Sequence, residues 1–580
     1  MAYMATARTL HLLHVTIALA VGPLLSSAAA QADSGVPSRT GIVVSASAPA
    51  SDVGAAILRQ GGNAVDAAVA TAFALAVTLP AAGNIGGGGF MLIRLRNGRT
   101  SVIDYREAAP ARATPTMYLR VDGSIDHDLS TKGYVAVGVP GTVRGLALAH
   151  KKYGRLPWAT GLAPAAALAA TGFPLSGPMA RELNWFVDSV FSRFPSSLAV
   201  YGKPPGGGQW AAGDTLRLPD LARALRDIAR TGPDVFYRGW IADSIASQMA
   251  AHGGLLTKAD LAAYRARERV PLRGTFRGYE IISAPPPSSG GTVLIEMLNI
   301  LERFDLKAAG RYSATTHHLT MEAMRRAYLD RARWLGDPDF APQPVQRLTS
   351  KAYADSLAAS IDPQRATASV HLGPNVACPP SEHPQTTHFS IVDRDGNAVA
   401  NTYTINWWYG SGLVVQGAGF LLNNEMDDFN KKQGCTGADG EIGTAANVIA
   451  PRKRMLSSMA PTIVAHNGQL RLVTGTPGGR TIPNTLLAVV LNVIEFGMTA
   501  REAVAGPRIH HAWMPDTALV EQAAMSDSLL TILREMGHTI QRVNEPRRWG
   551  DAHTIVIDET TGVAWGANDA SADSKVSRPE

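Results

Sequence analysis

The sequence predicts an α/β protein with a large hydrophobic core. Its 580 residues are 46% hydrophobic and 18% charged, which is more apolar material than one small domain needs. Patterns typical of helices alternate with patterns typical of strands, and we find no internal repeat. The Ala-rich stretch from Gly61 to Pro80 predicts a closely packed helix, and the period-2 alternation after Gln385 predicts a β-hairpin.

The first 30 residues have the composition of a cleavable export signal. Arg8 is their only charged side chain, an apolar run extends from Val15 to Leu25, and Ala28 and Ala30 stand at A-x-A spacing. The run is shorter than the roughly 18 apolar residues that a membrane span requires, and no later segment reaches that length. We therefore expect an exported protein, periplasmic or secreted, without a membrane span.

The net charge argues against a nucleic-acid-binding surface, and the cysteine content argues against a fold held by several disulfides. The formal net charge is only +6, and the densest basic cluster is Arg452, Lys453 and Arg454, so a nucleic-acid-binding surface is not expected. Cys378 and Cys435 are the only cysteines, which allows at most one disulfide, and the core must hold the fold.

Three motifs resemble parts of a phosphate site, a metal site and a serine hydrolase site, but each lacks residues that such a site requires. The run Gly86–Gly89 precedes a predicted strand, not a helix, so it indicates close backbone approach instead of a phosphate site. His317, His318 and Glu322 lack HExxH spacing and an obvious third ligand, which favours a polar helix face over a metal site. The serines of APPPSSGGT lack the GxSxG elbow of a serine hydrolase.

The register of the hairpin QTTHFSIVDRDGNAVANTYTIN can be worked out. A three-residue loop ending at Gly396, in the left-handed conformation, pairs Asp393 with Asn397. A two-residue Asp-Gly turn would mix polar and apolar residues on each face, so it is less favoured. The longer loop places Phe389, Ile391, Val399, Tyr403 and Ile405 on one face, and Thr386, His388, Ser390, Thr402, Thr404 and Asn406 on the other.

In this register Thr386 lies opposite Thr404, within reach of a hydrogen bond. Such a pair can simply stabilise the sheet by a few tenths of a kcal/mol. Alternatively, Thr386 is a nucleophile, which requires a base close to its hydroxyl. Cleavage between Gln385 and Thr386 would supply one, because the freed α-amine has an ordinary pKa of about 7.7 to 8.

The chain resembles the γ-glutamyltransferase (glutathione hydrolase) family over essentially the whole mature sequence. The resemblance rests on nine motifs in family order: GGNAVDAAVA, GNIGGGGFML, DYREAAPARAT, APPPSSGGT, EAMRRAYLDRARWLGDPDF, TTHFSIVDRDGNAV, LLNNEMDDF, MLSSMAPTI and VTGTPGGR. It implies an N-terminal-nucleophile fold, a four-layer αββα sandwich. It also implies a proenzyme that cuts itself before Thr386, with residues 1–30 as signal peptide, 31–385 as large subunit and 386–580 as small subunit.

The resemblance also implies the roles of individual residues. Thr386 would be the nucleophile, Thr404 a supporting hydroxyl, and the backbone of Gly478 and Gly479 the oxyanion hole. Residues that bind the γ-glutamyl group would be Arg106, Ser457 and Ser458 for its α-carboxylate, and Asn406, Glu425 and Asp428 for its α-ammonium. From the residues alone, Arg106 could instead form a surface ion pair, and the glycines and serines could simply form turns.

The implied reaction forms a γ-glutamyl ester on Thr386 from glutathione or another γ-glutamyl compound and passes it to water, an amino acid or a dipeptide. No metal or organic cofactor is needed. Two alternatives stay open: a cephalosporin acylase of the same fold, which attacks a glutaryl group without an α-amine, and a noncatalytic binding protein. Residues 430–454 have the length of the family's lid but carry no aromatic gate residue.

Overall fold

The computed structural model describes residues 34–204, 206–373, 377–378, 386–432, 436–437, 445–543, 549–569 and 573–579. The predicted signal peptide, Gln385 and Cys435 lie outside the described residues, and so does the Cys378 side chain. No helix in the described ranges combines the length and the hydropathy that crossing a membrane requires.

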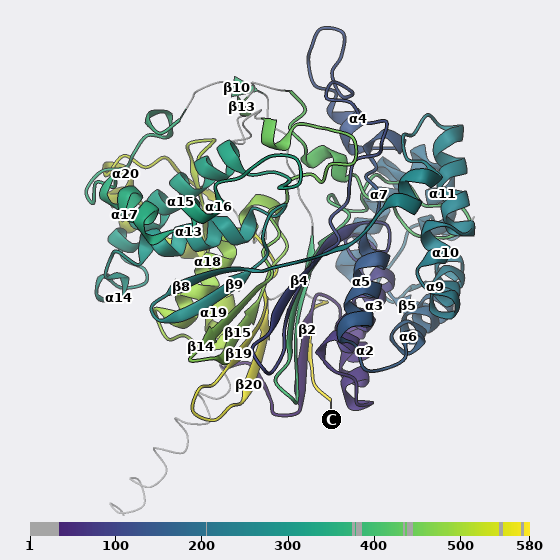
Figure 1. Ribbon diagram of the computed structural model, residues 1–580, viewed down its shortest axis with the longest axis horizontal. Coiled ribbons are helices and arrows are strands. Elements are labelled where there is room, and N and C mark those ends of the chain that lie inside the picture. The colour runs from purple at the N-terminus through teal and green to yellow at the C-terminus, as the bar shows by residue number, and fades with distance from the viewer. Residues whose placement is uncertain are drawn as a thin grey trace, which may run out of the picture.

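Two seven-stranded sheets lie face to face between two layers of helices (Figure 1). Neighbouring strands are antiparallel in both sheets. The first sheet has the order β21 (Lys575–Ser577), β2 (Gly41–Ser45), β11 (Thr387–Asp393), β12 (Ala398–Thr404), β3 (Gly88–Arg94), β4 (Thr100–Asp104) and β7 (Arg267–Arg269). The second has the order β1 (Val36–Ser38), β20 (Ala564–Asn568), β19 (His553–Ile557), β15 (Gln469–Thr474), β14 (Thr462–His466), β9 (Tyr279–Ser283) and β8 (Leu272–Phe276). This is the predicted αββα sandwich.

Helices cover the outer face of each sheet (Figure 1). The layer over the first sheet contains α2 (Ala48–Arg59), α3 (Ala64–Thr78) and α5 (Thr142–Tyr153). Further helices of this side are α6 (Trp158–Thr171), which packs on α3, α9 (Pro219–Thr231), which packs on α6, and α4 (His127–Thr131), α7 (Gly177–Ser189), α8 (Pro195–Tyr201), α10 (Asp234–Tyr237), α11 (Trp240–Ala251) and α12 (Lys258–Ala263). The layer over the second contains α13 (Gly290–Leu301), α15 (Ala314–Trp334), α17 (Lys351–Ala359), α18 (Ile482–Ile494) and α19 (Ala500–Ala505), with α14 (Leu306–Ala309), α16 (Val345–Leu348) and α20 (Asp527–Glu535). A small sheet, β16 (Ile509–His510), β17 (Ala518–Glu521) and β18 (Ile540–Val543), packs beside them.

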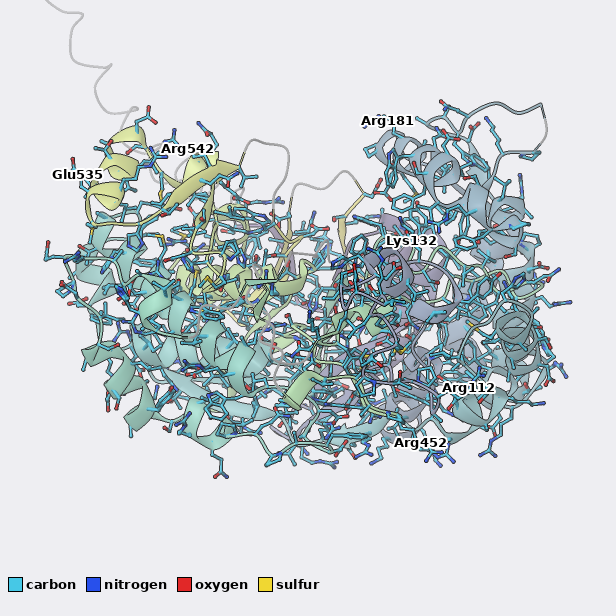
Figure 2. All side chains as sticks on the ribbon, turned by 90° about the horizontal axis from the view of Figure 1, so that it is seen from above. Arg112, Lys132, Arg181, Arg452, Glu535 and Arg542 are labelled. Atoms are coloured by element: carbon cyan, nitrogen blue, oxygen red, sulfur yellow. The ribbon has the colours of Figure 1, made fainter. Side chains whose placement is uncertain are left out.

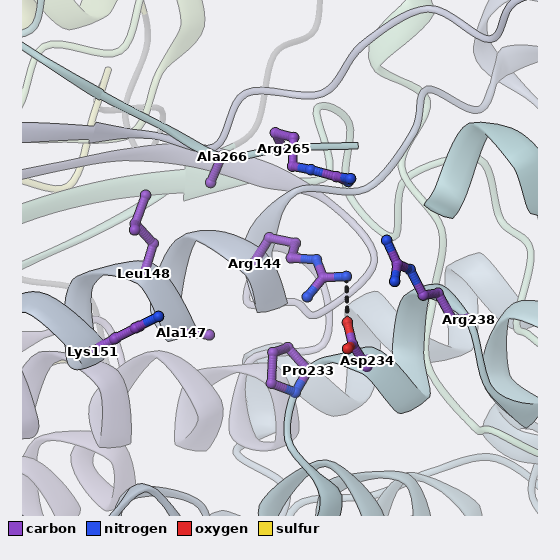
Figure 3. A pocket seen from close by; sticks show the side chains of 9 residues that line it. All are labelled: Arg144, Ala147, Leu148, Lys151, Pro233, Asp234, Arg238, Arg265 and Ala266. Carbon is purple, nitrogen blue, oxygen red and sulfur yellow. Dashed lines mark hydrogen bonds and ion pairs between the residues drawn. The ribbon is translucent and has the colours of Figure 1, made fainter. Parts of the chain in front are cut away.

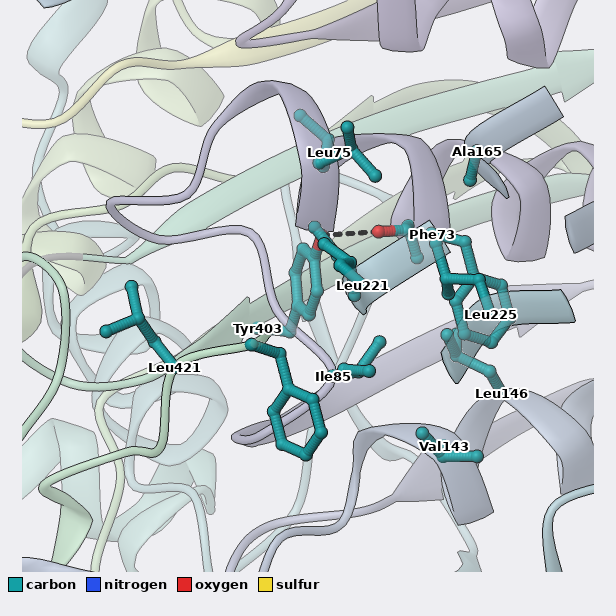
Figure 4. Packing of buried hydrophobic residues seen from close by; sticks show 14 of the residues in the cluster. Phe73, Leu75, Ile85, Val143, Leu146, Ala165, Leu221, Leu225, Tyr403 and Leu421 are labelled. Carbon is teal, nitrogen blue, oxygen red and sulfur yellow. Dashed lines mark hydrogen bonds between the residues drawn. The ribbon is translucent and has the colours of Figure 1, made fainter. Parts of the chain in front are cut away.

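Helix α3 is the predicted Ala-rich helix and is buried along its whole length. Its first turn is closed by a capping box, in which Asn63 Oδ1 accepts from Asp66 N at 3.0 Å and Asp66 Oδ2 accepts from Asn63 N at 2.9 Å. Its small side chains let α3 lie directly on the first sheet, where the Tyr403 hydroxyl donates to the Ala72 carbonyl at 2.9 Å (Figure 4). The centre of the first sheet is thereby tied to its helical layer.

The predicted register of the hairpin is confirmed. Thr387 pairs with Tyr403 and Val392 with Ala398, while Asp393 N donates to Asn397 O at 3.0 Å. Gly396 has φ of +86°, the left-handed conformation that the three-residue loop requires. The apolar face lies in the core between the sheet and α3, and Val392, Ala398 and Ala400 from the opposite face pack between the two sheets.

Candidate active site

The candidate nucleophile stands immediately before an interior strand of the first sheet, which lies between β2 and β12. Thr386 precedes β11, and its side chain is 8% exposed. The observed register, extended by one residue, places it opposite Thr404 at the end of β12. The Thr404 hydroxyl is buried and accepts from Asn406 N at 2.8 Å, with Asn406 at φ of +74°. The chain therefore turns sharply after β12, and this turn keeps Asn406 close to Thr386.

The polar face of the hairpin continues into a buried hydrogen-bond network. His388 Nδ1 lies 2.8 Å from the Thr402 hydroxyl, its Nε2 lies 3.1 Å from the Ser390 hydroxyl, and Ser390 donates to the His553 carbonyl at 2.8 Å. Burial, aided by the neighbouring His553, holds the pKa of His388 well below its ordinary value, so its imidazole is neutral. A Cβ at Gly475 would lie 2.1 Å from the His388 ring, which explains the glycine there. His388 thus holds Ser390, whose hydroxyl joins the first sheet to β19 of the second.

The glycine run before β3 supports the same region through close backbone contacts, as predicted. A Cβ at Gly87 would lie 2.0 Å from the Thr404 carbonyl, and one at Gly86 would lie 2.1 Å from the Leu421 carbonyl. Asn423 also donates from its backbone N to Gly86 O at 3.1 Å. The run therefore lets the segment that carries Glu425 approach the end of β12.

Arg106 is buried at the centre of a cluster of carboxylates. Its Nη1 donates to Glu425, its Nη2 donates to Asp428, and Glu107 Oε2 lies 3.6 Å from Nη1. Burial opposes the charge of Arg106, but Glu425, Asp428 and Glu107 outweigh it and raise its pKa above the ordinary value. Because the side chain is 1% exposed, the alternative of a surface ion pair is wrong.

The same guanidinium connects the cluster to the two candidate serines. Arg106 Nη2 donates to the Leu456 carbonyl at 3.0 Å and Nε donates to the Met455 carbonyl at 3.3 Å, directly before Ser457 and Ser458. The serine segment does not form the turn that the residues alone allowed. It runs parallel to the APPPSSGGT segment, with Ser457 N donating to Pro287 O at 2.9 Å and a bridge between Ser288 and Ser457.

Asn406 is brought beside the carboxylates by its own hydrogen bonds. Its Nδ2 donates to the Asn424 carbonyl at 3.2 Å, and Asn424 N donates to the Ile405 carbonyl at 3.2 Å. Asn424 is followed by a 3₁₀ turn, Glu425–Asp428. The structure thus brings Glu425 and Asp428 into contact with Arg106 and places Asn406 against Asn424, next to Glu425. Ser457 and Ser458 follow directly after the Leu456 carbonyl that accepts from Arg106.

Gly478 and Gly479 form the turn that follows β15. Their φ values are +131° and +54°, and a Cβ at Gly478 would lie 2.4 Å from the Thr481 hydroxyl. The Gly478 carbonyl accepts from Thr481 N at 3.0 Å and from its hydroxyl at 2.8 Å. With their carbonyl side fixed in this way, the glycines can present backbone N–H groups to a ligand.

The histidines of α15 acquire a partner that the sequence did not reveal. His318 Nδ1 lies 2.8 Å from His538 Nε2, and Glu322 lies close enough to complete a three-residue group. However, Glu322 is bonded to both Arg325 and Arg326, which a metal cation would have to displace. His317 instead contacts the Ser313 carbonyl. The group is best described as a buried ion-pair network.

Comparison with known proteins identifies the family. The family model described as gamma-glutamyltranspeptidase matches residues 50–578. The chain belongs to this family. A relative named glutathione hydrolase proenzyme, from Escherichia coli (strain K12), is 47% identical over 92% of this chain and 91% of the relative.

Two solved structures have a fold similar to that of this chain. A cephalosporin acylase from Bacillus halodurans has a TM-score of 0.82 and 29% identity, covering 94% of this chain and 97% of its own. A chain of Helicobacter pylori gamma-glutamyltranspeptidase has a TM-score of 0.54 and 44% identity, covering 55% of this chain and 91% of its own.

We predict that Glu107→Gln flattens the pH dependence of stability. Burial, against the opposing charge of Arg106, raises the pKa of Glu107 from 4.5 to about 7. The folded protein therefore keeps this proton up to about pH 7 while the unfolded chain releases it near 4.5, so wild-type stability falls as pH rises between these values. Urea unfolding at several pH values measures the effect.

The control for this experiment is Glu535→Gln, because Glu535 is exposed on α20 at the edge of the molecule (Figure 2). Its unfolding curves should follow wild type at every pH. A constant offset between Glu107→Gln and wild type from pH 5 to pH 8 would contradict the raised pKa.

Proposed function

We propose that this protein is a γ-glutamyltransferase and glutathione hydrolase that cleaves the γ-glutamyl amide bond of glutathione and other γ-glutamyl compounds. The observation that carries the proposal is the buried pairing of Arg106 with Glu425 and Asp428 beside Ser457 and Ser458. A site of one cation and several anions matches the zwitterionic head of a γ-glutamyl group. The 47% identical relative named glutathione hydrolase supports the same activity.

Substrate binding would exchange ion-pair partners inside this cluster. The α-ammonium would take over Glu425 and Asp428, with the Asn406 side-chain oxygen as a further acceptor, and the α-carboxylate would take over Arg106. Because each buried charge gains an opposite charge in return, the exchange leaves none of them uncompensated. A glutaryl group, which lacks the α-amine, would take Arg106 and leave both carboxylates without a cation.

The reaction would proceed in two acyl transfers at Thr386. The hydroxyl oxygen attacks the γ-carbonyl carbon while the free α-amine of Thr386 takes the hydroxyl proton, and the N–H groups of Gly478 and Gly479 stabilise the oxyanion. The C–N bond then breaks, and the amine passes its proton to the leaving nitrogen. Water, an amino acid or a dipeptide attacks the resulting ester, and Thr386 is regenerated.

Maturation would use the same hydroxyl. Thr386 attacks the preceding carbonyl of Gln385, the peptide nitrogen is released as the acyl group moves to oxygen, and water hydrolyses the ester. Residues 31–385 and 386–580 then remain together as large and small subunits. The Helicobacter pylori chain, 91% of which aligns with only 55% of this chain, supports a product of two separate polypeptides.

We also propose that the protein is exported. Residues 1–30 would act as a signal peptide that directs it to the periplasm or the medium. The substrates are small molecules, and the proposed chemistry uses only side chains and backbone groups of the chain itself.

Thr386→Ala should abolish both self-cleavage and turnover. On a denaturing gel, wild type should give two bands and the variant one full-length band, because the hydroxyl acts in both reactions. Release of the aniline from a γ-glutamyl anilide should fall by about 10⁴-fold or more. Glycylglycine should accelerate the wild-type release if the ester is passed to acceptors.

The matched control is Thr387→Val, which keeps the side-chain volume. Thr387 is 1% exposed, lies on the apolar face of the hairpin and has no hydrogen-bond partner for its hydroxyl among the described residues. This variant should be processed and active. A single full-length wild-type band would refute the proposal, and turnover of glutaryl but not γ-glutamyl substrates would establish the acylase alternative.

A further inference from the structure

Arg331 contacts the candidate substrate site from behind. This residue of α15 donates from Nε to the Ser289 hydroxyl at 3.0 Å and from Nη2 to the Ser458 hydroxyl at 3.0 Å. The side chain is 8% exposed. Ser289 in turn donates to the Ser457 carbonyl from its hydroxyl at 2.6 Å and from its backbone N at 2.8 Å. One guanidinium therefore bonds Ser458 directly and supports the Ser457 backbone through Ser289.

These contacts fix the direction of the hydrogen bonds. A guanidinium only donates, so Ser458 Oγ accepts from Arg331 and its own hydrogen must point elsewhere. Ser289 likewise accepts from Arg331 and donates onward to the Ser457 carbonyl. Ser458 is half-buried, so its hydroxyl hydrogen can reach an acceptor in the substrate site.

Charge distinguishes Arg331 from Arg106. Arg106 is surrounded by Glu107, Glu425 and Asp428, whereas among the described residues no carboxylate oxygen lies within ion-pair distance of Arg331. A buried cation without a counter-ion attracts an anion strongly, because little solvent screens it. A carboxylate that enters the site would therefore be attracted by the uncompensated positive charge of Arg331, which lies behind Ser458.

We propose that Arg331 is a positioning residue for the substrate α-carboxylate: it turns the Ser458 hydroxyl hydrogen toward that carboxylate and supplies the positive charge that Arg106 shares with three acids. This proposal rests on the γ-glutamyl activity proposed above. It assigns to α15 and to the APPPSSGGT segment a role in recognising the substrate.

The test compares two ligands that differ only in the α-carboxylate. For a γ-glutamyl anilide, Arg331→Gln should raise KM about tenfold or more and change kcat little, because Arg331 binds the head group and not the reacting carbonyl. For 4-aminobutyryl anilide, used as a competitive inhibitor, the inhibition constant should change less than about twofold. Arg331→Lys, which keeps the charge, should recover part of the loss.

Arg333→Gln is the matched control, since Arg333 lies on the same helix and donates to the Leu372 carbonyl at 3.1 Å. It should leave KM unchanged. Equal losses for both ligands in a processed Arg331→Gln protein would overturn the inference and leave the proposed function intact. A wild-type protein without γ-glutamyl turnover would overturn the proposed function itself.

A cavity of about 480 Å³ has several basic side chains in its lining and is separate from the candidate substrate site. It is lined by α5, α10 and the segment around Arg265 (Figure 3). Its charged lining residues are Arg144, Lys151, Arg238, Arg265 and Asp234. The guanidinium groups of Arg144, Arg238 and Arg265 point toward the same space (Figure 3).

The single carboxylate in this basin is already used. Asp234 accepts from Arg144 at 2.6 Å, and that bond, together with the charges of Arg144, Arg238 and Arg265, lowers its pKa. Arg265 donates to the Ala262 and Tyr264 carbonyls at 2.7 and 2.8 Å, which leaves its charge uncompensated. Arg238 and Arg265 are exposed, so solvent weakens the repulsion between these cations, and an anion that joins them relieves it further. We infer that the basin binds a phosphate-type oxyanion, which planar guanidinium groups hold with paired hydrogen bonds.

Calorimetric titration with inorganic pyrophosphate at low salt tests this inference. Arg238→Gln and Arg265→Gln should each weaken binding by about tenfold, whereas Arg230→Gln, an exposed arginine paired with Asp227 on α9, should not. Sedimentation with phosphatidic acid vesicles separates the sources: arginine-dependent vesicle binding assigns a lipid headgroup, and pyrophosphate binding alone assigns a soluble phosphate. Absence of pyrophosphate binding, or binding that all three variants keep, would overturn the inference that the basin binds an oxyanion.

Discussion

The structure depends on the register between β11 and β12. These strands lie at the centre of the first sheet, between β2 and β3, and their loop is fixed by Gly396 in the left-handed conformation. Because side chains alternate along a strand, a slip of one residue would send Thr386 into the apolar core and Thr387 to the site. The same register places His388 and Thr402 in the network between the sheets. One loop thus decides which threonine lies on the face of the candidate site.

Arg106 provides the second constraint, because it joins segments that are distant in sequence. Glu425 is separated from it by 319 positions, and its other partners include Asp428 and the Leu456 carbonyl. Three acids surround one buried cation, and burial raises the pKa values of Glu107 and Glu425, so ionising all three acids at once is opposed. Such a cluster is costly in an empty site and is compensated when a ligand brings an ammonium group. We therefore regard the cost as the basis of selectivity for zwitterionic head groups.

The sequence predicted the local features well. Turn chemistry and alternation were enough to give the hairpin register, and the glycines of 86–89 indicated the close backbone approach that their contacts confirm. The four-layer arrangement came from the family resemblance, since alternating helix and strand patterns do not specify how two sheets pair. The hairpin register is set by residues that are close together along the chain, whereas a run of glycines indicates a close approach without identifying the segment that approaches.

Contacts between distant segments could not be predicted. The bond from Arg331 to Ser458 spans 127 positions, and His538 joins His318 across 220 positions, with no spacing pattern to mark either pair. From the residues alone, a surface ion pair was the favoured interpretation of Arg106, and its 1% exposure excludes that. The assignment of the site residues to catalysis and binding therefore combines a resemblance with a geometry that gathers them.

The proposed chemistry requires that Thr386, as a new N-terminus, carries the acyl group. The intact mass of the small subunit after brief reaction with a γ-glutamyl anilide and quenching in acid tests this requirement. We expect a polypeptide that begins at Thr386 to gain the mass of one γ-glutamyl group, and fragmentation to locate that group on the first residue. An adduct on any other residue, or continuing turnover by an uncut chain, would show that Thr386 does not carry the acyl group.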